Sequence, residues 1–337
     1  MHKHVLLLLT SLFVLSCYHL FAQETPPKYP DLAKELIAMR KPDQKLRIQY
    51  VKLLQTGKQG TKRYERVRDR LIATDRQNTA RMREIVEEYG WPTYDLVGRR
   101  ASSAAWILVQ HADRSPLFQA HCLKLLKAAV DEGQASPRNY AYLYDRVQLA
   151  FGNKQLYATQ TTKNEFTKQS FFQTIEDEAG VQERRAAMDI EEHVVDYAAR
   201  NGFTYTVPTE QEAQNRADSI AQTYAKYSQL AKAAMAAENY AEAVDYYMWV
   251  NYCDGHTTAE DYYELARAIS LADHKHKTWA SYFLRKAILR GHAGGRNYDT
   301  NPDLENIKNA NPDNWAEMLA TREEMHKFIM GLEINKR

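Results

Sequence analysis

Apolar residues recur at every third or fourth position along much of the chain, and this spacing restricts it to a mainly α-helical fold. The clearest example is residues 61–89. The apolar face there consists of Tyr64, Val67, Leu71, Met82, Ile85 and Tyr89. Glycine, which weakens helices, supplies only 13 of the 337 residues. We therefore expect a mainly α protein built from packed helices.

Serine, proline and glycine mark where these helices begin and end. Ser115-Pro116 and Ser136-Pro137 each predict a helix start, because serine can accept hydrogen bonds from free N–H groups and proline fits the first helical position. Gly90 predicts the end of the long helix.

Residues 31–56 are expected to form two short helices separated at Lys41-Pro42, with the proline in the first turn of the second. About six helices then make a compact bundle over residues 30–152, the larger part of a helical domain at residues 30–205.

The helical pattern is interrupted twice before the second half of the chain. Residues 157–175 crowd Thr, Phe and Gln together without a helical period, which predicts a small β-hairpin or an ordered loop. Residues 202–208 read as a second short extended piece. Pro208 and the polar run after it mark the expected domain boundary.

The second half, residues 210–330, resembles a tetratricopeptide-like module. Ala231 occupies the small position of a first helix, and Ala243, Tyr247 and Val250 fill the second helix of the same unit. A second unit follows at residues 259–290. The resemblance implies a helical scaffold of the kind that contacts a protein or peptide partner.

The N-terminus has the layout of a secretory signal peptide at residues 1–22, with a basic start and an apolar run from Val5 to Leu15. Cleavage after Ala22 would give an exported protein, periplasmic or secreted. Alternatively, the sequence ending at Cys17 resembles a lipobox, which would leave a lipid anchor on Cys17. The run is too short to span a bilayer, and no second stretch reaches that length.

Six short motifs identify a family resemblance over about residues 32–200. They are D-x-x-N at 75–78, GWP at 90–92, LVG at 96–98, QHAD at 110–113, AYLYDR at 141–146 and YATQ at 157–160. In this order they resemble a bacterial domain of unknown function, number 6624. The resemblance implies a mainly helical domain without an established activity, so it transfers no catalytic residues. One departure is Ala158, where the family has glycine; alanine is strained there if the turn needs a positive φ.

Polar side chains interrupt several of the predicted apolar stripes. His111 continues the stripe of Ala104 and Leu108, Asp75 falls on the face of residues 61–89, and Arg146 lies beside Val147. A buried polar group without a partner costs about 1–3 kcal/mol, so we expect these groups to bind one another. Asp75 could instead cap a new helix after a break at Thr74.

Three interpretations of this polar cluster stay open. It could be a structural network that fixes the order of the helices. It could line a catalytic pocket, with His111 as general acid or base, Asp113 or Asp145 orienting it, Arg146 holding an anion and Gln160 contributing from the loop. It could be a metal site of His111, Asp113 and Asp145, but a spacing of two turns helical side chains apart, and no metal or other cofactor is assigned.

Function is the least determined property of the sequence. It contains no HExxH, GxSxG, GxxxxGK or CxxC motif, and its balance of 45 Lys+Arg against 43 Asp+Glu gives no support for nucleic-acid binding. We expect a binding or scaffold protein of the cell envelope, with an exposed aromatic face near Tyr247 and Tyr263. The alternative is a hydrolase-type enzyme, which predicts a pocket that reaches His111.

Overall fold

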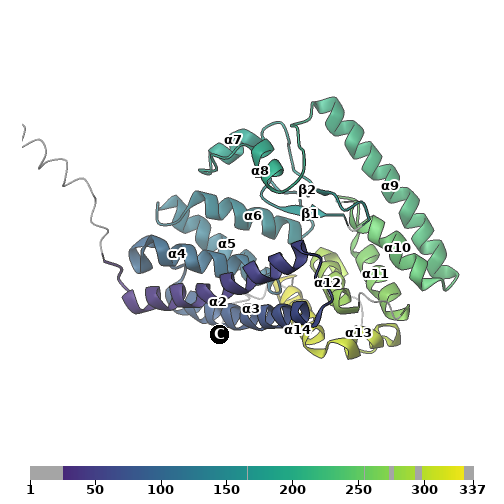
Figure 1. Cartoon of the computed structure of the whole chain (residues 1–337), viewed down its shortest axis with the longest axis horizontal. Coiled ribbons are helices and arrows are strands. Elements are labelled where there is room, and N and C mark those ends of the chain that lie inside the picture. Colours follow the sequence, from purple (N-terminus) through teal and green to yellow (C-terminus); the bar gives the residue numbers. More distant parts are fainter. Residues whose placement is uncertain (1–25, 165, 254, 273–276, 293–297, 330–337) are drawn as a thin grey trace, which may run out of the picture.

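The computed structural model describes residues 26–164, 166–253, 255–272, 277–292 and 298–329. The proposed signal peptide and Cys17 lie outside these ranges. As predicted, the protein is mainly α-helical, and the described residues contain one small two-stranded sheet (Figure 1). None of the described helices combines the length and the hydropathy that crossing a bilayer requires.

Five helices form the first bundle. They are α2 (Pro30–Gln55), α3 (Lys62–Tyr89), α4 (Tyr94–Gln110), α5 (Pro116–Asp131) and α6 (Pro137–Ala150). Thr61 and Ser136 cap α3 and α6 by accepting a backbone N–H of the first turn, whereas Ser115 makes no such bond although α5 begins at Pro116. Gly90 ends α3 with a φ of 70°.

Two predicted helix breaks are wrong. Residues 30–55 form one helix with Pro42 inside it, because α2 packs along α3 and α4 and these contacts hold both halves in line. The proline removes only one backbone hydrogen bond from the helix. Helix α3 likewise continues through Thr74, so Asp75 is no N-cap.

The core of this bundle surrounds α4. Ala101, Ala104 and Ala105 are at most 1% exposed, so neighbouring helices approach α4 closely. The regular part of α4 follows Gly98, whose φ of 78° lies in the left-handed region. His111 is the first residue after α4 and thus emerges at the end of the most buried helix.

A hairpin follows the bundle, as predicted for residues 157–175. Strands β1 (Thr161–Lys163) and β2 (Ser170–Phe172) are antiparallel, with Thr162 opposite Phe171. The short helices α7 (Val181–Ala186) and α8 (Val194–Arg200) cover it. The predicted extended piece at residues 202–208 forms no strand, because it has no neighbouring strand to pair with.

The rest of the chain is again helical. Its elements are α9 (Glu210–Ala236), α10 (Tyr240–Asn251), α11 (Ala259–Leu271), α12 (Lys277–Ala287), η2 (Ile288–His292), η3 (Pro302–Leu304), α13 (Glu305–Ala310) and α14 (Pro312–Ile329). Helix α9 starts at a capping box formed by Thr209 and Glu212, directly after Pro208. Helices α9 to α12 pack in succession, as a tetratricopeptide-like module would, but the repeat family itself stays a prediction.

Tyr247 and Tyr263 are buried in the core of this module. Tyr247 is 2% exposed and Tyr263 is 4% exposed. These two rings are therefore no part of the predicted exposed aromatic face, and the exposed rings Trp279 and Tyr282 lie on α12 instead.

Helix α14 returns to the first bundle and lies beside α3 (Figure 1). Arg76 of α3 donates to Glu317 at 2.5 Å, and Arg114, from the loop between α4 and α5, donates to the same carboxylate at 2.6 Å. Arg83 pairs with Glu324, which lies about two helical turns after Glu317 on α14. The two halves of the chain thus meet through a polar contact next to His111.

Candidate functional site

The His111 ring is bound by two side chains of α2. Its Nδ1 lies 3.0 and 3.1 Å from the carboxylate oxygens of Asp43. Arg47, one turn further along α2, places its Nε 2.8 Å from the same Nδ1 and 3.2 Å from Asp43 Oδ1. Asp43 is fully buried, whereas the His111 side chain is 16% exposed.

These distances determine which ring nitrogen carries the proton. The single hydrogen on Arg47 Nε can be directed to only one of its two acceptors. If Nδ1 of His111 were unprotonated, its lone pair would face the Asp43 carboxylate at 3.0 Å. A protonated Nδ1 donates to Asp43, and Arg47 Nε–H can donate to the same carboxylate, although the 2.8 Å contact between Nε and Nδ1 then joins two donors. Since both carboxylate oxygens of Asp43 face Nδ1, we assign this tautomer, which leaves Nε2 as an acceptor.

The charges around the ring favour a neutral imidazole. Burial lowers the pKa of His111, and the nearby Arg47 adds to this effect, although Asp43 opposes it. Burial raises the pKa of Asp43, but the hydrogen bond from His111 and the charge of Arg47 outweigh it, so the pKa of this carboxyl stays below its usual range. At neutral pH the pair is therefore a carboxylate and a neutral histidine.

Asp75 of α3 completes the cluster. Arg47 Nη2 donates to its carboxylate at 2.7 Å. Burial, with the charges of Asp43 and Asp113, raises the pKa of Asp75 to about 7 despite Arg47. Asp75 thus changes charge near neutral pH, above the range in which His111 accepts a proton.

A cavity of about 230 Å³ reaches His111. One side is formed by α3 with Asp75 and Thr79, a second by His111 and Ser115 of the loop between α4 and α5, and a third by α14. Among the described residues no hydrogen bond involves Nε2 of His111. His111 thus lines the cavity, and its Nε2 is an acceptor that no described residue uses.

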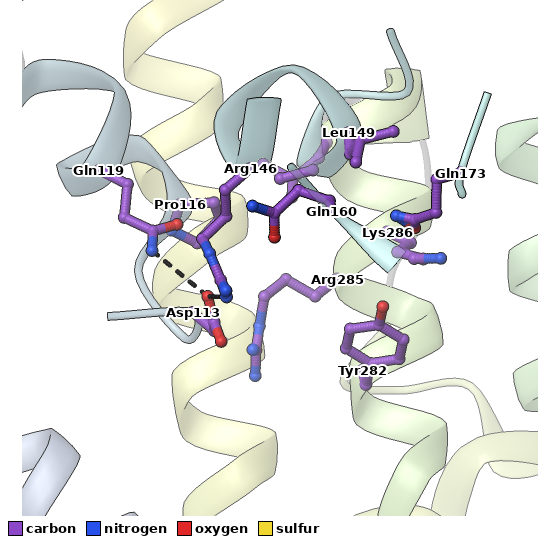
Figure 2. A pocket seen from close by; sticks show the side chains of 12 residues that line it. Asp113, Pro116, Gln119, Arg146, Leu149, Gln160, Gln173, Tyr282, Arg285 and Lys286 are labelled. Carbon is purple, nitrogen blue, oxygen red and sulfur yellow. Dashed lines mark hydrogen bonds and ion pairs between the residues drawn. The ribbon is translucent and has the colours of Figure 1, made fainter. Parts of the chain in front are cut away.

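Asp113 and Arg146 lie at a second cavity, of about 200 Å³ (Figure 2). Arg146 donates to Asp113 at 2.6 Å, and Gln119 donates to the same oxygen at 3.3 Å. Gln160 lines this cavity too, while its amide nitrogen donates to the Tyr142 carbonyl.

Asp145 has a different role from the one considered in the sequence. Its buried carboxylate accepts the backbone N–H groups of Leu156 and Thr159 at 2.8 and 3.0 Å, and the Thr159 hydroxyl at 2.8 Å. On the other side of this loop, the fully buried Arg185 donates to the Tyr157 carbonyl at 2.8 Å. The charged groups of Asp145 and Arg185 thus fix the backbone of residues 156–159 by hydrogen bonds. Asp145 does not contact His111.

The structure thus divides the predicted site residues into three groups. His111 belongs with Asp43 and Arg47, Asp113 with Arg146 and Gln160, and Asp145 with the loop. Within the ranges that the structure describes, no group of three or more His, Cys, Asp and Glu side chains is placed to hold a metal ion.

Sequence reasoning missed Asp43 and Arg47, although a signal was present. The buried face of α2 is formed by Leu32, Leu36, Asp43, Leu46 and Leu53. Asp43 is thus a charge inside an apolar stripe, the same anomaly that drew attention to His111. A break assumed at Pro42 divides this stripe in two and hides it.

Comparison with known proteins gives one finding. The profile of a family of unknown function, DUF6624, matches residues 30–200, which include α2 to α8 and every predicted site residue. No curated protein and no solved structure matches the chain significantly.

Proposed function

Since the chain belongs to the family of unknown function DUF6624, which carries no activity with it, we propose from its own geometry that it is a hydrolase-type enzyme with His111 as general base. The observation that supports this proposal is the buried Asp43 bound to Nδ1 of a histidine that lines a cavity. A buried carboxylate on one imidazole nitrogen orients the ring and stabilises the positive charge that forms when the other nitrogen takes a proton.

In this proposal His111 Nε2 takes a proton from a water molecule that attacks the substrate in the cavity. Asp75 borders the same cavity and, with a pKa of about 7, can return a proton to the leaving group. Two titratable groups with opposite tasks thus line one cavity, and burial lowers the pKa of His111 while it raises that of Asp75.

The scaffold and the enzyme considered in the sequence analysis predict different structural features. A pocket that reaches His111 is the feature expected of the enzyme, whereas Tyr247 and Tyr263, near which the scaffold was expected to expose an aromatic face, are buried. We propose in addition that the protein is exported, on the strength of the apolar run from Val5 to Leu15; the mass of the native N-terminus tests this, because Gln23 or a lipidated Cys17 should come first.

The test of the enzyme uses His111→Asn. The asparagine amide can donate to Asp43 as Nδ1 does, so the fold is retained while Nε2 is lost. We expect the full chain to hydrolyse at least one member of a panel of p-nitrophenyl esters, phosphates and glycosides, and His111→Asn to lower kcat/KM by at least about 100-fold. The control is His326→Asn, at an exposed position of α14.

The pH profile provides a second readout. Activity should fall on the acid side as His111 becomes protonated, below its usual range because its pKa is lowered, and on the alkaline side as Asp75 ionises near pH 7. Asp75→Asn should remove the alkaline limb. Hydrolysis of no panel member, or full activity of His111→Asn, would contradict the proposal.

A binding role is the second candidate, and one observation favours it. Trp279 and Tyr282 of α12 are 50% and 46% exposed, and with Phe171 of β2 they line a cavity of about 240 Å³. An aromatic surface of this kind is typical of peptide contacts. It lies on the tetratricopeptide-like module, where the sequence analysis expected a protein or peptide partner.

A further inference from the structure

The second cavity, beside Asp113, is separate from the cavity at His111, and the two share no lining residue. It lies where the family domain meets the C-terminal module (Figure 2). Arg146 comes from α6, Gln160 from the loop before β1, and Arg285 from α12. A ligand there would contact both halves of the chain at once.

Arg285 is a buried cation without a close counter-charge. The residue is 5% exposed, and its Nε is buried without a hydrogen-bond partner. Its ion pair with Glu317 is long, at 3.9 Å, and that carboxylate already accepts from Arg76 and Arg114. Burial and the charge of Arg114 lower the pKa of Arg285 to about 10, which still leaves it positive at neutral pH. A buried charge in this condition is unfavourable unless something neutralises it.

Arg146, which also lines the cavity, likewise has a guanidinium nitrogen that is buried without a hydrogen-bond partner. One of its terminal nitrogens binds Asp113, but its Nε is buried without a partner. Figure 2 shows both guanidinium groups extending toward Asp113. Lys286 adds a third cation at the edge of the cavity. The two guanidinium groups and the carboxylate of Asp113 leave an excess of one positive charge.

We propose that this cavity binds a phosphate group between Arg146 and Arg285. Guanidinium groups match the oxygens of phosphate in pairs, and phosphate has more oxygens than a carboxylate with which to bind both groups at once. A volume of about 200 Å³ accommodates a phosphate group together with a small organic part. The ligand is inorganic phosphate or the phosphate of a small monoester, and this site does not depend on the function of His111.

Calorimetric titration of the full chain at low ionic strength tests the proposal, because salt screens partly exposed charges. We expect inorganic phosphate to bind at least about tenfold more tightly than acetate, and to raise the melting temperature. Glycerol phosphate is the second arm: tighter binding than inorganic phosphate identifies a monoester as the ligand, and weaker binding identifies free phosphate. Equal binding of acetate, or no binding of either phosphate, overturns the proposal.

Two variants locate the site. Arg285→Met and Arg146→Gln should each weaken phosphate binding at least about tenfold, because each removes a charged hydrogen-bond donor. Arg63→Met removes the same charge from an exposed position of α3 outside the cavity and should leave binding unchanged. Binding by Arg285→Met as tight as in the unaltered chain, or equal loss in Arg63→Met, contradicts the assignment.

An NMR measurement on the unaltered chain tests the same site even if a variant does not fold. The Nε–H resonances of Arg146 and Arg285 in a ¹⁵N correlation spectrum should shift on addition of phosphate and saturate with the calorimetric affinity. Unshifted resonances at saturating phosphate overturn the proposal.

Discussion

Ala158, a single residue of the YATQ motif, lies at a position where the backbone is left-handed. Its φ is 50°, in the left-handed region, and it is fully buried in the loop that Asp145 and Arg185 hold. The sequence analysis expected glycine here and strain for alanine if the turn needed a positive φ. The backbone has that φ, so the expectation is confirmed.

Ala158→Gly should therefore stabilise the protein. Glycine adopts this conformation without the steric penalty of a Cβ, and the gain of about 1–2 kcal/mol exceeds the added entropy of the unfolded chain, about 0.4–1 kcal/mol. We expect a net increase of about 0.5–1 kcal/mol in the free energy of unfolding, measured by urea denaturation. Ala187→Gly is the matched control, because Ala187 has a helical φ of −63° and should lose stability. A loss at Ala158 as well would show that the strain is absent.

At the same scale, sequence patterns located polar residues better than they located their partners. A histidine in an apolar stripe predicts a polar contact, and His111 has one. The partner could not be read from the sequence, because Asp43 is 68 residues away and on another helix. Arg285 escaped notice for a related reason: it adjoins the apolar Phe283 and Leu284, and only the packing of α12 on α14 shows that it is buried.

Among the elements, α2 differs most from its sequence pattern. Pro42 lacks the N–H that would bond to the preceding turn, yet the helix continues on both sides of it. This continuity places Asp43 and Arg47 one turn apart beside His111. Tertiary contacts with α3 and α4 thus overrule a local signal that favours a break.

Pro42→Ala should raise the stability of the protein. The exposed alanine restores one helical hydrogen bond and removes the ring clash, which together are worth about 3 kcal/mol, against about 0.4–1 kcal/mol for the freer unfolded chain. We expect the denaturation midpoint in urea to rise by the equivalent of about 2 kcal/mol. A lower midpoint would mean that a bend at Pro42 is needed to align the two halves of α2.

The sequence predicted best those helices whose first and last residues have a clear preference for a helix end. The start of α6 at Ser136-Pro137 and the end of α3 at Gly90 follow from capping and backbone conformation alone. The segment at residues 202–208, predicted as a short extended piece, is neither helix nor strand from Thr204 on, because a strand also needs a partner strand, and local composition does not reveal whether one is adjacent.

In the whole molecule, two apolar cores meet across a polar contact. The buried residues of one core come from residues 32–147, and those of the other come from residues 231–325 with the addition of Leu117. The ion pairs of Arg76, Arg83 and Arg114 with α14 lie between them. This arrangement could not be predicted, because the return of α14 depends on contacts between residues more than 200 positions apart.

The two halves should fold separately and associate. We expect the fragment of residues 209–337 to melt cooperatively, and to bind the fragment of residues 30–208 with an affinity that falls as salt is added, because exposed ion pairs are screened. Circular dichroism and calorimetry measure the two properties. A non-cooperative melt of residues 209–337 would mean that this half cannot fold without the first bundle. Binding that does not weaken with salt would mean that Leu117 and other apolar contacts, not the ion pairs, hold the two fragments together.

The position of α14 has an evolutionary consequence. The family match ends at residue 200, whereas one side of the His111 cavity is built by Glu317, Thr321 and their neighbours. The residues proposed to do chemistry and the surface that would select a substrate are thus inherited in different segments of the chain. If the proposed reaction holds, changes in the C-terminal segment can alter its substrate while the family domain keeps the reacting residues, and relatives that carry another segment there would act on other molecules.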